Sequence, residues 1–149
     1  MPWTNTNLET LEETFVASIR QITPRHQRAT DDGWKPYLRE RPPSIGVRWF
    51  RLEWDTIGYT PGGFIGDRLV DTSVTLSVIV DYGSMPEAVA KRVIEDDHYQ
   101  LRDVLNLLKA TTEGLIWVEA IDWEETAESK PDQMQAIHQY LVRYMQRRA

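Results

Sequence analysis

The tightest group of titratable side chains in this 149-residue chain is the run Asp96-Asp97-His98. Carboxylates beside an imidazole are groups that bind divalent cations or transfer protons in active sites. The same carboxylates also suit the first turn of a helix, where they accept hydrogen bonds from free amides and face the positive end of the helix dipole. Because such caps are common, we expect Asp97 and Gln100 to begin a helix, and we expect no metal at this cluster.

The other residues that could act as metal ligands, nucleophiles or phosphate-binding groups do not occur at the spacings that such sites require. The histidines, His26, His98 and His138, form no four-residue pair that would place two metal ligands on one helix face. No serine lies in a Gly-x-Ser-x-Gly elbow, and the absence of cysteine excludes thiolate catalysis, disulfides and cysteine-ligated zinc. The glycine-rich stretch GYTPGGFIGD at 58–67 lacks the Lys-Ser/Thr of a phosphate-binding loop. These spacings therefore predict no catalytic residue and no cofactor site.

Aromatic and basic residues point instead to assembly. Six tryptophans are many for a single small domain, and tryptophan and tyrosine are enriched in protein interfaces. Basic residues interleave with Trp34 and Tyr37, as in a nucleic-acid groove, but Asp31, Asp32 and Glu40 among them favour a charged interface arm. The residues that we expect in an assembly interface are Trp34, Tyr37, Arg39, Arg41, Trp49, Tyr59, Phe64, Ile65 and Arg68.

The elements that would position these residues begin with an amphipathic helix. Apolar residues recur there at three- and four-residue steps, at Leu8, Leu11, Phe15, Ile19 and Ile22. Pro24 ends this helix, because its ring cannot follow a helical residue without strain. Residues 24–44 hold four prolines and mixed charges, and they predict an irregular extended arm.

Two strands flanking a glycine-rich tip predict a long hairpin in the middle of the chain. The first strand covers 45–55, the projecting tip covers 58–67, and the second strand covers 69–81. The second strand alternates most clearly, which predicts one buried face and one face that is wet or contacts a neighbour. The buried face consists of Val70, Val74, Leu76, Val78 and Val80.

The second half of the chain predicts a central helix and two closing strands. The helix follows a capping box at Ser84 and Glu87, and we expect the acidic run 95–97 to break it. Its apolar stripe contains Leu101, Val104, Leu105 and Leu108. Residues 115–123 predict a strand, and residues 134–146 fit either a helix or a strand, of which we favour the strand because of their β-branched and aromatic residues.

These elements predict one α+β domain over residues 1–149, with a mainly antiparallel sheet of about four strands against the N-terminal helix and a broken central helix. No apolar run is long enough to cross a membrane, and the N-terminus lacks the pattern of a secretory signal. The net charge of −6 argues against a protein that grips nucleic acid along its whole surface. Composition thus predicts an intracellular globular protein.

Six stretches carry a resemblance to a known family, namely LETLEETFVASIRQI, VRWFRLEWDT, RLVDTSVTLSVIVDYG, EAVAKRVIEDDHYQLRDVLNLL, GLIWVEAIDW and AIHQYLVRYM. Their order resembles that of the tail terminator, or tail-completion, proteins of long-tailed bacteriophages. The match spans most of residues 8–146. Its most suggestive part is VTLSVIVDYG followed by an acid-containing helix that ends in RDVLNLL, and LVRYM resembles the last strand of that family.

The resemblance implies a structural virion protein without enzyme activity, which forms a homohexameric ring at the head-proximal end of a phage tail. Such a ring caps growth of the tail tube and joins the tail to the neck. Its partners would be the tail tube protein, the neck or connector protein and, in a contractile tail, the sheath protein. Genome DNA would pass through the lumen without sequence-specific binding, and an acidic lumen does not retain a polyanion. The protein would occupy the host cytoplasm during assembly and the virion afterwards.

Two alternatives remain open at this point. One is another head–tail joining protein, such as a neck or head-closure ring component. The other belongs to a different class, and is a small intracellular enzyme or ligand-binding α+β domain that uses Asp96, Asp97 and His98. The surplus of aromatic residues and the long loops favour assembly over catalysis.

Overall fold

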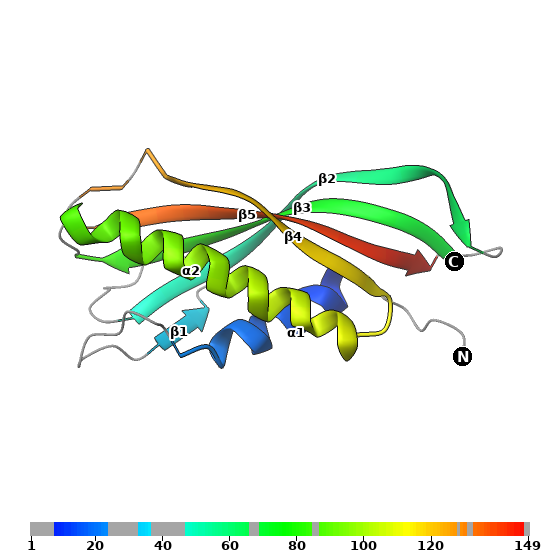
Figure 1. Ribbon diagram of the computed structural model, residues 1–149, viewed down its shortest axis with the longest axis horizontal. Helices are drawn as coiled ribbons and strands as arrows, with labels where there is room; N and C mark the ends of the chain where they lie inside the picture. Colours follow the sequence, from blue (N-terminus) through cyan, green and yellow to red (C-terminus); the bar gives the residue numbers. More distant parts are fainter. Residues whose placement is uncertain are drawn as a thin grey trace.

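Two helices and a five-stranded mixed sheet form the computed structural model, which describes residues 8–23, 33–36, 47–65, 69–84, 87–127, 129–130 and 133–147 (Figure 1). The helices are α1 (Leu8–Arg20) and α2 (Glu87–Leu107), and α2 continues into a 3₁₀ turn, η1 (Leu108–Ala110). The strands are β1 (Gly33–Pro36), β2 (Val47–Ile65), β3 (Leu69–Gly83), β4 (Leu115–Glu125) and β5 (Met134–Arg147). The expected α+β class is confirmed.

The sheet has the strand order β1-β2-β3-β5-β4. All neighbouring strands are antiparallel except β1, which runs parallel to β2 and adds a strand inside the segment that we expected to be an irregular arm. The ambiguous last element is a strand, as favoured, and it pairs with β3 on one side and β4 on the other. β5 is an interior strand of the sheet, and its apolar content is explained by the residues that it contributes to the core, namely Met134, Ala136, Tyr140, Val142 and Tyr144.

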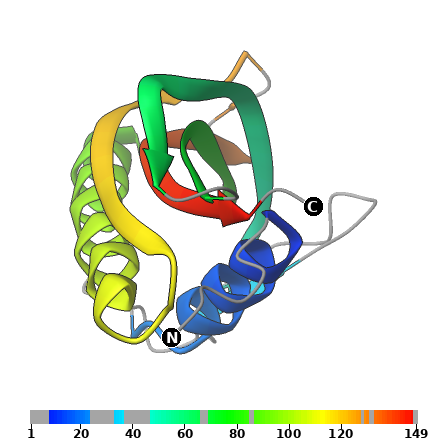
Figure 2. The same cartoon turned by 90° about the vertical axis from the view of Figure 1, so that its right-hand side faces the viewer.

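Both helices pack on one face of a strongly curved sheet (Figure 2). The apolar stripe of α1 is buried at Leu11, Phe15 and Ile19, as its periodicity predicts. The helix-facing side of β3 is buried from Thr72 to Tyr82, and it shares one core with α2. The core residues that α2 contributes are Ala90, Val93, Ile94, Leu101 and Leu105, with Val104 and Leu108 partly buried against them.

The second face of β3 differs from the expectation of a wet surface. Ser77, Ile79 and Asp81 point away from the helices, yet all three are buried. Figure 2 shows why, since the sheet curls so that this face lies inside the curve.

None of the helices in the described residues is both long enough and apolar enough to cross a membrane.

The expected hairpin is present, but its strands are much longer than predicted. β2 continues beyond Asp55 to Ile65, and Tyr59, Phe64 and Ile65 lie in register with residues of β3. Most of the stretch 58–67 is therefore strand rather than a projecting turn. Two register shifts, between Asp55 and Gly58 and between Tyr59 and Phe64, let the irregular glycine- and proline-containing sequence continue in the ladder.

The central helix is continuous from Glu87 to Leu107, so the predicted break at the acidic run is wrong. Asp97 and His98 lie in its interior rather than at an N-cap, and both side chains are buried against the sheet. The periodic apolar residues on both sides of the run belong to one stripe. The run does not end the helix because the structure provides a partner for the buried carboxylate.

Candidate functional site

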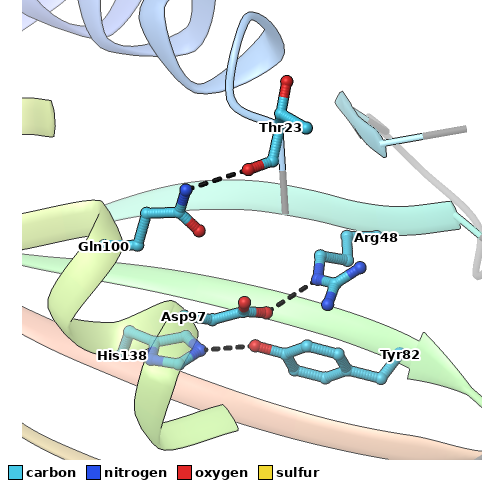
Figure 3. Close-up of polar contacts among 6 residues, drawn as sticks. All are labelled: Thr23, Arg48, Tyr82, Asp97, Gln100 and His138. Carbon is cyan, nitrogen blue, oxygen red and sulfur yellow. Dashed lines mark hydrogen bonds and ion pairs between the residues drawn. The ribbon is translucent and has the colours of Figure 1, made fainter. Parts of the chain in front are cut away.

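A buried ion pair joins the middle of α2 to the start of β2. Arg48 Nε donates to Asp97 Oδ2 at 2.7 Å, and both side chains are nearly inaccessible to solvent (Figure 3). The guanidinium also lies 5.7 Å from the ring centre of Trp34 and 5.6 Å from that of Tyr82. The arginine thus contacts a carboxylate and two aromatic faces, which help to replace the water that it lost on burial.

Two buried histidines continue this polar cluster toward β5. Tyr82 Oη lies 2.9 Å from His138 Nε2, and His138 Nδ1 lies 3.1 Å from His98 Nδ1. The two imidazole rings are stacked, with centroids 5.3 Å apart. Tyr140 donates its hydroxyl to the backbone oxygen of His98 at 2.7 Å, so the sheet also holds α2 through the main chain.

Asp97 Oδ2 accepts a hydrogen bond from Arg48 Nε, because an ionised carboxylate only accepts. The polar contacts then continue from Tyr82 Oη to His138 Nε2, and from His138 Nδ1 to His98 Nδ1. A neutral histidine has one donor and one acceptor nitrogen, so His138 can donate to one of these neighbours and accept from the other.

Burial keeps all four rings of the cluster neutral. Desolvation lowers the pKa of His98 to about 4, with nearby Asp122 opposing this shift and Arg102 adding to it. Desolvation, followed by the charge of His98, lowers the pKa of His138 well below its usual value. Burial and the Asp97 carboxylate raise the pKa values of Tyr82 and Tyr140 well above that of a free phenol. Asp97 and Arg48 are therefore the charged pair within a neutral ring cluster.

We expect this cluster to make the protein sensitive to mild acid. Below pH 6.5 the unfolded chain protonates both histidines while the folded state does not, so the free energy of unfolding falls as the pH is lowered. The slope between pH 6.5 and about 5 should approach ~1.4 kcal/mol per pH unit for each histidine. Urea unfolding at pH 7, 6 and 5 measures it. The His98→Gln/His138→Gln double variant should lose this part of the slope, and equal slopes in both proteins would contradict the assignment.

The cluster has the chemical types of an acid–base site but lacks access for a substrate. Asp97 and His138 are fully buried and His98 is 2% exposed. Their polar contacts link α2 to three strands, namely β2 through Arg48, β3 through Tyr82 and β5 through His138. Among the described residues, no group of three or more histidine, aspartate or glutamate side chains is arranged to hold a metal ion. The geometry therefore supports a role in packing α2 on the sheet.

The expected interface residues divide into three groups. Trp34 lies in the monomer core, 3% exposed, against Phe50 and Arg48, so the structure does not place its ring on an outer surface. Its position follows from strand β1, which the proline-rich composition had concealed. Trp49 is half-buried on β2. Tyr37, Arg39, Arg41 and Arg68 lie outside the described residues, as do the side chains of Tyr59, Phe64 and Ile65, whose backbones form part of β2.

An exposed apolar feature that we had not assigned to the interface lies on the edge strand β4. Trp117 is 45% exposed and Ile121 is 52% exposed. Register shifts occur beside both residues, between Leu115 and Trp117 and between Ala120 and Asp122. The sequence did contain a pattern that indicates the exposure of Trp117. This residue alternates with Ile116 and Val118, which places its indole on the opposite face of the strand.

Acidic residues surround this apolar feature. Glu119, Asp122, Glu124 and Glu125 are all exposed on the same strand. β4 is therefore an acidic edge that carries two exposed apolar side chains, and we call this surface the β4 edge.

Comparison of the whole chain with protein-family models and with curated proteins finds no match.

Proposed function

We propose that this protein is a ring-forming structural protein of a phage tail, of the tail terminator type. In this proposal a homohexameric ring caps the tail tube and joins it to the neck or connector, and DNA passes through the lumen. The resemblance in the order of elements and the geometry of the sheet support it. The family resemblance supplies the number of subunits and the partners.

The extended β2–β3 hairpin is the observation that carries the proposal. β2 has 19 residues and β3 has 15, whereas strands in globular proteins usually have about 3–10. At ~3.3 Å per residue, β2 alone has a contour length of about 60 Å, which is long for a domain of this size. Figure 1 shows the distal part of the hairpin, with the end of β5, extending beyond both helices.

A domain gains little stability from strands that extend beyond its core. Ordering a backbone residue costs about 1–2 kcal/mol, which burial or pairing must offset. An extension of this kind is explained when a neighbouring molecule covers it. In a ring, a projecting element of one subunit can contact a different surface of the next, and rotation closes the assembly.

Shortening the hairpin tests this proposal. Tyr59 and Thr72 are paired across the ladder, so an Asn-Gly turn can replace residues 60–71 between them. The strand pairs from Trp49 to Tyr59 stay, as do the buried positions of β3 from Thr72 onward. We expect a cooperatively folded monomer that no longer forms rings, as measured by sedimentation velocity and electron microscopy.

The matched control replaces only residues 66–67, in the connection between the strands, with Ser-Gly and leaves both the ladder and Arg68 unchanged. This variant should assemble like the unmodified protein. In infected cells the shortened hairpin should give tails of abnormal length or tails without heads. Tails of normal length joined to heads in the shortened variant would refute a role for the hairpin in assembly.

A further inference from the structure

We propose that the β4 edge of one subunit docks into a groove between α1 and β2 of the next subunit. This inference rests on the proposed ring and names two surfaces that would form a subunit contact in addition to that of the hairpin. Trp117 and Ile121 are the donor side chains on the β4 edge. The acceptor groove is lined by residues of α1, by Pro36 of β1 and by residues of β2.

The groove has the shape and the chemistry that an apolar edge requires. Its volume is about 570 Å³, and its apolar lining residues are Val16, Ala17, Pro36, Phe50 and Leu52. The charged residues around it are Glu12, Glu13, Arg20 and Arg51. Large aromatic side chains that enter such pockets contribute most of the binding energy in protein interfaces, and a charged rim adds selectivity.

Within the part of the chain that the structure describes, β4 does not contact α1 or β2, so the edge does not fill the groove of its own chain. β4 is the last strand in the order β1-β2-β3-β5-β4, and the groove lies at the β1–β2 end. β3 and β5 separate the two surfaces. A contact between them must therefore join two copies head to tail, and this type of contact closes into a ring when the rotation between copies allows it.

The charges of β4 disfavour the obvious alternative, in which two β4 edges pair symmetrically. Such pairing would bring Glu119, Asp122 and Glu124 of one copy against the same acids of the other, and like charges placed opposite each other are destabilising. The acids can instead approach Arg20, which is exposed at the groove. Charge therefore disfavours the symmetric pair, whereas the groove rim carries two acids and two arginines, so docking there is driven by burial of the apolar side chains with Arg20 as a partner for the acids.

A backbone amide of the β4 edge already has a hydrogen-bond acceptor within its own chain. Val118 N–H donates to Asn106 Oδ1 of α2 at 3.1 Å, so this amide already has an acceptor within its own chain. A strand from another molecule would have to displace Asn106 to pair there. Contact through side chains needs no such displacement, which is why the proposal assigns recognition to Trp117 and Ile121 rather than to strand addition.

A complementation experiment tests the docking. The edge variant is Trp117→Ser/Ile121→Ser, and the groove variant is Ala17→Trp, which fills the groove from an exposed position on α1. Each variant alone should be a folded monomer. An equimolar mixture should form heterodimers and nothing larger, because the mixture retains one intact edge and one intact groove per pair. Sedimentation velocity measures the species, and circular dichroism and thermal unfolding verify the fold.

The controls carry similar changes on helix α2. Leu107→Ser removes an apolar side chain that is 71% exposed, and Ala88→Trp adds an indole at another exposed helical alanine. Both should assemble like the unmodified protein. Ring formation by either test variant alone would overturn the docking while leaving the ring proposal intact, and so would a mixture that stays monomeric. An unmodified protein that is monomeric at every concentration would overturn the ring proposal itself.

Discussion

Asp97→Ala should destabilise the protein by about 3–5 kcal/mol, since it leaves the guanidinium of Arg48 buried without its carboxylate. The rings of Trp34 and Tyr82 remain beside the arginine, but a desolvated cation–π contact contributes about 2 kcal/mol and does not replace a carboxylate. A loss of this size is a large fraction of the 5–15 kcal/mol that is usual for a folded domain. Urea unfolding at pH 7 provides the measurement.

Asp103→Ala on the same helix is the matched control. Asp103 lies 2.9 Å from Arg102, and both side chains are more than 40% exposed. Exposed pairs of this kind contribute about 0–1 kcal/mol, and both substitutions gain the same helix propensity of alanine. A destabilisation by Asp97→Ala no larger than that by Asp103→Ala would show that the buried pair has no structural role.

A third variant separates loss of the ion pair from loss of packing. Arg48→Met/Asp97→Leu removes both charges and keeps apolar volume at the site. Replacing a buried pair by apolar residues is often neutral or stabilising, so this variant should recover most of the stability that Asp97→Ala loses. Failure to recover would indicate that the polar contacts of the pair, and not the unpaired charge, hold α2 on the sheet.

Val142→Asp should prevent folding under ordinary conditions. Val142 is fully buried at the centre of β5, and it lies opposite Val74 on β3 and Val118 on β4. A carboxylate there would have valines as its cross-strand neighbours on both sides. Burying an unpaired charge costs more than the ~4 kcal/mol that few single substitutions exceed. We expect loss of the cooperative unfolding transition and of dispersed amide signals in NMR spectra.

Val89→Asp provides the same substitution at an exposed valine. Val89 lies in the first turn of α2 and is 45% exposed, and a carboxylate near a helix N-terminus interacts favourably with the helix dipole. This control should fold with unchanged or slightly higher stability. A Val142→Asp protein that folds like the control would show that the register of β5 is wrong.

Sequence periodicity was sufficient to identify the face of an element that packs in the core between the helices and the sheet. The three- and four-residue steps of α1 correctly identified Leu11, Phe15 and Ile19 as buried. The alternation of β3 correctly identified Val74, Leu76, Val78 and Val80, although the side chain of Val70 lies outside the described residues. Composition alone also favoured a strand for the last element, because β-branched and aromatic side chains fit a pleated surface.

Periodicity was insufficient where a polar residue is buried by a distant partner. Asp97 resembled a helix cap because its partner, Arg48, lies 49 residues away in the sequence. No pattern in the neighbouring residues indicates that the two side chains form a pair. The pairing of His98 with His138 spans 40 residues and depends on the register of β5 against β3. For the same reason the acidic run 95–97 was predicted to break the helix, whereas α2 continues through it.

The sequence by itself determined the fold class, the two helices, the main strands and their buried faces, because these depend on local spacing between apolar residues. Only the tertiary structure decided which of the residues expected on a surface are buried, and which strand forms an exposed edge of the sheet. It placed Trp34 in the core through β1, and it placed Trp117 and Ile121 on an outer strand. The physical reason is that burial of a single side chain depends on which strand lies beside it, and strand order is a property of the whole chain.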